Sequence, residues 1–204
     1  MCLDLIYQGM RKVQKSDKVT SPEVLVLLSG GLDSAACLSF YIDLGRPTCG
    51  LFIDYQQPVA NREGCAARAI ADFYDVLLYT AKWSGQSKKQ SGIIAARNAF
   101  LLIAALMERP EQVTTIALGI HAGTQYADCS QEFVSQMQST FDIYSGGAVH
   151  IAAPFVDWTK ADIWAYALSK NVPVDLTYSC EAGPTHPCGK CLSCLDRISL
   201  ETHA

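Results

Sequence analysis

The stretch Val24-Leu25-Val26-Leu27-Leu28-Ser29-Gly30-Gly31-Leu32-Asp33-Ser34 decides the fold of this chain. Its five leading apolar residues follow Pro22 and end before two glycines, which is typical of a strand buried on both faces of a parallel sheet. From Asp33 to Leu44 the apolar residues recur with helical spacing, and Gly45 and Pro47 end the pattern. The stretch therefore predicts a strand, a tight turn and a helix.

The same alternation continues along the chain. We expect further strands at 48–53, 75–80, 113–120 and 149–153, and further helices at 60–74, 95–108, 130–144 and 159–171. This order predicts an α/β fold, a Rossmann-like doubly wound parallel sheet with helices on both faces. Ligands of such sheets bind beyond the carboxyl ends of the strands. Functional residues are therefore expected in the loops 29–34, 54–58, 81–98, 119–129 and 154–160.

The composition narrows the possible functions. Of the 204 residues, 50% are apolar and 18% are charged, which is typical of a folded globular chain. The net charge is −4, so the overall basic field of a nucleic-acid-binding protein is lacking. No apolar run reaches the roughly 18 residues of a membrane span, and the first 20 residues lack a secretory signal pattern. We expect a cytoplasmic protein, a setting that disfavours disulfides between its nine cysteines.

The turn after the first strand has the features of a phosphate-binding loop. Gly30 and Gly31 let the backbone approach an anion, Ser29 and Ser34 add hydroxyl groups, and the following helix offers its positive N-terminus. Asp33 would repel a phosphate unless a magnesium ion lies between them. The alternative is a plain strand–turn–helix in which Asp33 or Ser34 caps the helix.

Four cysteines near the C-terminus have the spacing of a metal site. Cys180, Cys188, Cys191 and Cys194 form C-x7-C-G-K-C-L-S-C, in which two C-x2-C steps overlap. This spacing favours a structural zinc site with a closed tetrahedral shell of thiolates. An iron–sulfur cluster or simple packing are the alternatives, and His186 is not needed as a ligand. We expect an N-terminal arm at 1–22, an α/β domain at 23–176 and a zinc-binding segment at 177–204.

Together, the loop and the cysteine cluster resemble the 7-cyano-7-deazaguanine synthase family of the pyrophosphate-loop ATP pyrophosphatases, over about residues 24–200. Intermediate stretches that agree are Asp54-Tyr55-Gln56, Ala96-Arg97-Asn98, Gly119-Ile120-His121, Tyr126-Ala127-Asp128-Cys129, Glu132-Phe133, Ala153-Pro154-Phe155, Thr159-Lys160 and Thr177-Tyr178-Ser179-Cys180. The resemblance implies an enzyme that uses ATP with Mg²⁺ to adenylate 7-carboxy-7-deazaguanine. Ammonia then displaces AMP to give the amide, and a second adenylation leads to the nitrile. It also implies a homodimer.

The resemblance assigns roles to individual residues. The residues expected to bind ATP are Ser29, Gly30, Gly31, Leu32, Asp33, Ser34, Asp54 and Lys160. Those expected to bind the substrate are Arg97, Asn98, His121, Tyr126 and Asp128. Asp33, Lys160 and Arg97 are expected to act in catalysis. The alternatives are a solvated surface charge for Lys160, a helix-terminal salt bridge for Arg97, a turn cap for Asp128 and a structural histidine at 121.

Some residues depart from the family pattern. Gln56 stands where the family usually has glycine, Tyr178 where it has tryptophan, and Glu181 where it has tyrosine; Ile94 and Ala95 replace a proline. A divergent branch in antiviral gene clusters, including nucleotide-signalling defence systems, is at least as similar. There the activated carboxylate would be joined to an amine on a protein substrate. A zinc-knuckle nucleic-acid-binding module is the second alternative, which the charge of −4 disfavours.

Overall fold

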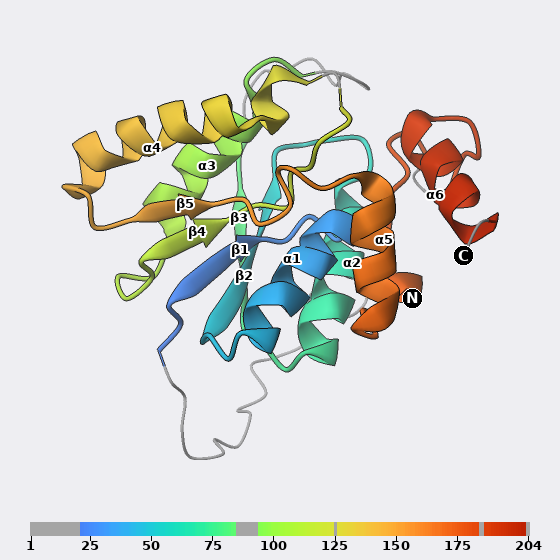
Figure 1. The fold of residues 1–204 in the computed structure, drawn as a ribbon, viewed down its shortest axis with the longest axis horizontal. Coiled ribbons are helices and arrows are strands. Elements are labelled where there is room, and N and C mark those ends of the chain that lie inside the picture. The colour runs from blue at the N-terminus through green and yellow to red at the C-terminus, as the bar shows by residue number, and fades with distance from the viewer. Residues whose placement is uncertain (1–20, 85–93, 125, 184–185, 203–204) are drawn as a thin grey trace.

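The computed structural model describes residues 21–84, 94–124, 126–183 and 186–202. Five strands form one parallel sheet in the order β3-β2-β1-β4-β5, with helices on both faces (Figure 1). The fold is therefore the expected Rossmann-like doubly wound sheet. The strands are β1 Val24–Leu27, β2 Thr48–Asp54, β3 Leu78–Lys82, β4 Thr115–Ala117 and β5 His150–Ala152. No helix within the described ranges is long and apolar enough to span a bilayer.

Six α-helices cover the sheet or follow it. They are α1 Leu32–Asp43, α2 Ala60–Phe73, α3 Arg97–Glu108, α4 Gln131–Ser145, α5 Lys160–Ser169 and α6 Leu192–Thr202, with 3₁₀ turns η2 Ala127–Cys129 and η3 Val174–Leu176. Helices α1, α2 and α5 pack on one face of the sheet, and α3 and α4 on the other (Figure 1). Helix α6 lies beyond α5, away from the sheet (Figure 1).

The central strand β1 shows why the sheet has two cores. Val24, Val26 and Leu28 point into the cluster with α1, α2 and α5, whereas Leu25 points into the cluster with α3 and α4. All four side chains are buried, with no exposed surface. Side chains of a strand alternate between faces, so a continuous apolar run is needed where both faces are covered. The structure therefore confirms the prediction that this apolar run is a strand buried on both faces of a parallel sheet.

Strands β3 and β4 differ most from their predicted bounds. Strand β3 begins at Leu78 rather than at residue 75, because Asp75 has a left-handed backbone (φ 53°) in the turn that ends α2. Strand β4 ends at Ala117 rather than at residue 120. Beyond it, Gly119 lies against the backbone of Asp33, so the chain has turned toward the start of α1. The expected loop at 83–92 falls mostly outside the described residues.

The C-terminal segment contributes no strand and is attached to the helical layer by polar contacts. Arg197 of α6 donates hydrogen bonds to the Thr177 hydroxyl (2.8 Å) and the Val174 carbonyl (3.2 Å). Its guanidinium carbon also lies 5.2 Å from the ring centre of Trp164 in α5. Helix α6 was not among the predicted helices. From its cysteines, prolines and glycines, the segment was predicted only to be a small metal-bound appendage rather than part of the sheet.

Candidate active site

Most of the expected site residues lie at the carboxyl edge of the sheet. Strands β1 and β4 are neighbours although they are far apart in sequence, so the chain order reverses between them. A crevice forms at such a switch point in open α/β sheets. The loop 29–34 leaves β1 here, and Gly119 follows β4. The topology thus places the glycine loop where a ligand is expected.

The loop after β1 is held by its own serines. The Ser29 hydroxyl donates to Ser34 Oγ (3.1 Å) and accepts from the Gly31 N–H (3.3 Å). The Ser34 hydroxyl donates to the Gly31 carbonyl (2.9 Å). Within the described chain, no side chain caps α1 at its N-cap residue Gly31. The first N–H groups of α1 are therefore available to an anion. Leu32 is buried (2% exposed), so only its backbone can take part.

Gly30 and Gly119 allow close backbone packing around the loop. Gly30 has a left-handed backbone (φ 86°), and a Cβ there would lie 2.5 Å from the carbonyl oxygen of Glu63 in α2. A Cβ on Gly119 would lie 2.5 Å from the carbonyl oxygen of Asp33. Both approaches exclude a side chain at ordinary contact distances. The loop is thus pressed between α2 and the chain that leaves β4.

Asp33 and Lys160 form an ion pair at the mouth of this loop. The Lys160 ammonium lies 2.6 and 2.5 Å from the two carboxylate oxygens. Lys160 is the first residue of α5, whose start is fixed by a capping box between Thr159 and Asp162. The two side chains are 29% and 26% exposed, so the pair is accessible to a ligand. The structure brings these two expected residues together although 127 positions separate them.

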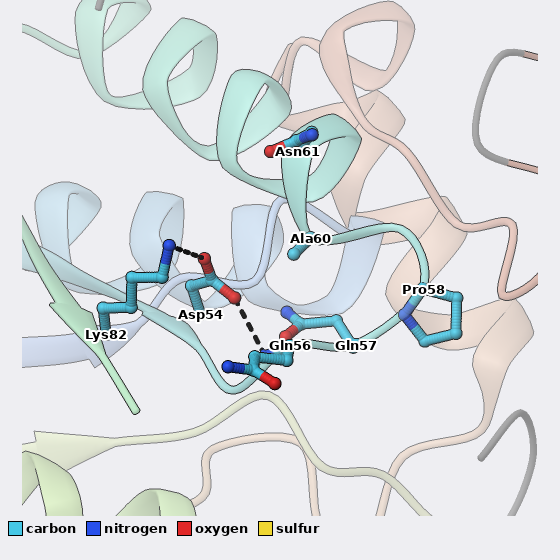
Figure 2. Close-up of a pocket in the computed structure, with 7 residues that line it drawn as sticks. All are labelled: Asp54, Gln56, Gln57, Pro58, Ala60, Asn61 and Lys82. Atoms are coloured by element: carbon cyan, nitrogen blue, oxygen red, sulfur yellow. Dashed lines mark hydrogen bonds and ion pairs between the residues drawn. The ribbon is translucent and has the colours of Figure 1, made fainter. Parts of the chain in front are cut away.

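Asp54 borders a polar cavity of about 370 Å³ at the ends of β2 and β3 (Figure 2). One Asp54 oxygen accepts from the Gln56 N–H (2.9 Å), and the other lies 3.7 Å from the Lys82 ammonium. The cavity is lined by Asp54, Gln56, Gln57, Pro58, Ala60, Asn61 and Lys82. Asp54 points toward this cavity and is already paired. Its expected part in ATP binding stays a prediction.

Arg97 begins α3 beside residues of β2 and α2. Its guanidinium is close enough to act electrostatically on the side chains of Tyr55 and Glu63. Burial raises the pKa of Tyr55, and the nearby Arg97 charge opposes that rise. Ala96, the residue before α3, has a left-handed backbone (φ 60°), which is uncommon for a residue with a side chain. Such strained residues cluster at functional sites.

Asn98 and Asp128 bind each other. Asp128 accepts from the Asn98 backbone N–H (3.3 Å), and the Asn98 side-chain amide donates to the Asp128 carbonyl (3.0 Å). One Asp128 carboxylate oxygen therefore satisfies an N–H in the first turn of α3. Asn98 is buried (6% exposed), and its amide also approaches the Cys129 sulfur at 3.8 Å. Burial raises the pKa of the Cys129 thiol.

His121 and Tyr126 lie on the connection between β4 and α4. The His121 ring nitrogen Nδ1 lies 2.6 Å from the Ala122 carbonyl oxygen, so this nitrogen carries the proton in that contact. Tyr126 precedes η2 and is partly buried. Neither residue makes a hydrogen bond to Arg97, Asn98 or Asp128 within the described chain. Their expected contacts with a substrate stay predictions.

The four cysteines of the C-terminal segment come together. Their sulfur atoms all lie within 4.8 Å of one another, and Cys188 and Cys194 are 4.0 Å apart. Four sulfurs around a tetrahedral zinc at bonds of about 2.3 Å would be about 3.8 Å apart. The cluster is therefore slightly wider than a zinc-bound shell and needs only a small contraction. The donor set fits a soft divalent metal ion.

Backbone N–H groups are aimed at these sulfurs. Cys180 Sγ accepts from the N–H groups of Gly183 (3.0 Å) and Cys188 (3.3 Å). Burial raises the pKa of the Cys180 thiol, but the N–H donors outweigh it and lower the value to about 6. Burial raises the pKa of Cys194 to about 12, and hydrogen bonding with Cys191, Cys180 and Cys188 raises it as well. A bound cation would favour the thiolate form of all four.

Tyr178 connects the cysteine segment to the glycine loop. Its backbone N–H donates to the Gly30 carbonyl (2.9 Å), and its hydroxyl donates to the Gly183 carbonyl inside the cysteine segment. The Arg62 guanidinium lies 5.3 Å from the Tyr178 ring centre. The cysteine segment therefore braces the loop after β1 from the side of α2.

The sequence analysis missed Glu63 and Gln57. The Gln57 amide donates to Glu63 Oε2 (2.7 Å) and accepts from the Tyr55 N–H (2.9 Å). Burial raises the pKa of Glu63, and the Gln57 hydrogen bond and the Arg97 charge oppose the rise. A signal was available, because Glu63 shares the helical spacing of the buried residues Ala66, Ala67 and Ile70. An acidic side chain on the apolar face of a helix needs a hydrogen-bonding or oppositely charged partner, because burying an unpaired charge is unfavourable.

Comparisons with known proteins agree with this architecture. The family model described as queuosine biosynthesis protein QueC matches residues 23–86 and 80–200. A 7-cyano-7-deazaguanine synthase of Synechococcus sp. (strain RCC307) is 31% identical over 203 residues, which cover 85% of this chain and 91% of the relative. Another, of Prochlorococcus marinus (strain MIT 9303), is 29% identical over 88% of this chain and 92% of its own length. The structure of NMN synthetase from Francisella tularensis has a TM-score of 0.50 and 17% identity, covers 88% of this chain and 83% of its own, and shows the same fold.

Proposed function

The chain belongs to the family of the queuosine biosynthesis protein QueC, and from this premise we propose that it is an AMP-releasing ligase acting on 7-carboxy-7-deazaguanine. In the proposed reaction, ATP adenylates the substrate carboxylate and ammonia displaces AMP to form an amide. The amide oxygen is adenylated in turn, and loss of AMP leaves the nitrile. A carboxylate is a poor electrophile and an amide oxygen a poor leaving group, so one adenylating site serves both steps.

The observation that carries this proposal is the glycine loop with its uncapped helix. The N-cap of α1 has no side-chain hydrogen bond, and the hydroxyls of Ser29 and Ser34 lie 3.1 Å apart beside it. A pyrophosphate there would accept from the backbone and interact favourably with the helix dipole. Lys160, which already reaches Asp33, would turn to the phosphates and offset their charge.

The two proposed metals have different roles. Oxygen donors suit Mg²⁺, and Asp33 would hold it beside the phosphates, where it would offset the charge of the leaving pyrophosphate. The four cysteines would hold a structural zinc, because a closed thiolate shell leaves no position for a substrate. Through Tyr178, this zinc would order the segment that braces the glycine loop.

The substrate is proposed to bind on the side of α3. Arg97 can bind a carboxylate through two parallel hydrogen bonds, and its position at the start of α3 adds the helix dipole. One carboxylate oxygen of Asp128 accepts from the Asn98 N–H. The carboxylate can still accept hydrogen bonds from the ring N–H and the amino group of the deazaguanine. Asn98, His121 and Tyr126 complete the proposed set from neighbouring loops.

A primary amine on a protein is the second candidate nucleophile. The observation that favours it is that Gln56 lies in a left-handed conformation (φ 67°) at the border of the cavity, where the family usually has glycine. Glu181 likewise replaces a tyrosine and interacts with Glu63. These departures concern the surroundings of the acyl group rather than the phosphate loop. They would alter the nucleophile and leave adenylation unchanged.

Mass spectrometry of the product tests the proposal. The protein is incubated with ATP, Mg²⁺, 7-carboxy-7-deazaguanine and an ammonium salt, and AMP and the deazaguanine product are measured. The proposal expects AMP release that requires the deazaguanine, together with the nitrile. A product that stops at the amide, or a deazaguanine joined to an added protein amine, would favour the second candidate. AMP release that does not depend on the deazaguanine would contradict both candidate reactions.

A further inference from the structure

Glu63 is an acidic residue that takes part in none of the proposed contacts with ATP or the substrate. It lies in the first turn of α2 and is partly buried, and its backbone carbonyl contacts Gly30 of the glycine loop. Its carboxyl group interacts electrostatically with Arg97, where the substrate carboxylate is proposed to bind. Glu63 therefore lies between the phosphate end and the acyl end of the proposed site.

The Glu63 carboxylate has one fixed oxygen. Gln57 donates to Oε2 at 2.7 Å, and Gln57 is itself held by the Tyr55 N–H (2.9 Å) and by the Ile53 carbonyl (3.4 Å). The Gln57 amide thus has a defined orientation at the end of β2. Among the described residues, only Oε2 of Glu63 accepts a hydrogen bond, so Oε1 can take another partner.

The other acids at this edge already have partners. Asp33 pairs with Lys160, Asp54 with Lys82 and the Gln56 N–H, and Asp128 with the Asn98 N–H. Glu63 instead has a neutral amide as its hydrogen-bond donor.

The electrostatic surroundings of Glu63 suit proton transfer. The largest influence is burial, which raises its pKa, and the nearby acids Asp54 and Glu181 raise it further. Gln57 and Arg97 lower it, and Tyr55 is the remaining titratable neighbour. A general base works best when its pKa is close to the working pH. A carboxyl group with a raised pKa approaches that condition.

We propose that Glu63 accepts the proton that is released when the amine attacks the acyl adenylate, an inference that rests on the proposed function. In this step the nitrogen of ammonia or of a primary amine forms a bond to the acyl carbon. The bond from that carbon to the AMP oxygen breaks, and AMP leaves with the electron pair. The proton lost by the nitrogen passes to Glu63 Oε1. Gln57 is a positioning residue that keeps Oε1 turned toward the acyl group.

The test separates the two half-reactions in Glu63→Gln. A glutamine retains the size of the side chain and an oxygen that can accept from Gln57, so the fold is expected to persist. Acyl-adenylate formation, measured as deazaguanine-dependent ATP–pyrophosphate exchange, should stay within about threefold of the wild type. The ammonia-dependent step should fall about 100-fold, the usual contribution of a general base. Hydroxylamine, which is uncharged at neutral pH and a stronger nucleophile, should largely restore product formation.

Glu108→Gln is the matched control, because Glu108 is exposed at the far end of α3. Both half-reactions should be unchanged in this variant. Equal loss of exchange and amide formation in Glu63→Gln would show a structural role and overturn the inference. So would an unchanged rate with ammonia. Absence of exchange in the wild type would instead contradict the proposed function, and a melting curve would show whether each variant is folded.

Discussion

The sheet and the cysteine segment reach a defined structure by different means. In the sheet, two clusters of buried apolar side chains cover both faces, and Val24, Leu25 and Val26 of β1 have no exposed surface. In the segment from residue 177 on, only Cys180, Gly183 and Cys194 are buried among the described residues. Leu192, Leu195 and Ile198 of α6 are largely exposed, at 69%, 49% and 51%. Apolar burial can account for the first region but not for the second.

The comparison teaches that the segment depends on its cysteines. Loss of apolar surface to water supplies roughly 25 cal/mol per Å², and the segment buries too little surface to fold on that basis. A structural zinc supplies on the order of 10 kcal/mol and couples metal binding to folding. Tyr178 joins this segment to the glycine loop by its hydrogen bond to Gly30.

The largest effect is expected from Cys191→Ser. Loss of one thiolate should abolish zinc binding and unfold the segment from residue 177, while the sheet stays folded. Metal content by atomic absorption and amide hydrogen exchange of α6 measure this outcome. Cys129→Ser is the control, because Cys129 is partly buried but lies outside the cluster. Retained zinc would contradict the role of Cys191 as a ligand. Unfolding of the sheet together with the segment would contradict the proposed boundary at residue 177.

The next largest effect is expected from Asp33→Asn. The substitution keeps the shape but removes the charge that pairs with Lys160 and would hold Mg²⁺. AMP release should fall about 1000-fold, within the range for loss of a charge-stabilising group in a site, with an unchanged melting temperature. Asp43→Asn at the other end of α1, where Asp43 pairs with Lys170, should keep full activity. Turnover that survives Asp33→Asn would contradict the role given to this ion pair.

These two regions also differ in how far the sequence predicts them. The glycine loop and the cysteine cluster are local patterns, so residues 29–34 and Cys188, Cys191 and Cys194 could be recognised by spacing alone. Lys160 and Arg97 could be proposed only through the family resemblance, because tertiary packing brings them to the edge of the sheet. Glu63 and Gln57 were missed as site residues because their role depends on contacts between β2, α2 and α3, which local sequence patterns do not show. The start of β3 and the end of β4 were missed because a left-handed turn precedes β3 and a tightly packed turn follows β4.

Gly30→Ala measures how closely the loop is packed against α2. The residue has a left-handed backbone, and its Cβ would meet the Glu63 carbonyl, so unfolding free energy should fall by about 2–3 kcal/mol. Gly45→Ala provides the comparison, because Gly45 has φ 69° with no atom within 4 Å of the added Cβ. That variant should lose only about 1 kcal/mol. If urea unfolding showed the same loss of unfolding free energy in both variants, the contact with α2 would contribute nothing to stability.

The smallest effect is expected from Gln56→Gly. Gln56 has a left-handed backbone (φ 67°), and its N–H donates to Asp54, a bond that glycine retains. Relief of the backbone strain should exceed the added entropy of the unfolded chain and raise stability by about 0.5 kcal/mol. The midpoint of urea unfolding should therefore increase slightly. A decrease would mean that the Gln56 side chain stabilises the cavity by contacts of its own.

A crystal structure with an ATP analogue that cannot be cleaved between the α and β phosphates tests the central claim most directly. The account predicts that the β and γ phosphates contact the N–H groups of Gly31 to Ser34 and that Lys160 turns from Asp33 to the phosphates. Phosphates bound elsewhere, with the loop empty and the Lys160–Asp33 pair intact, would contradict it.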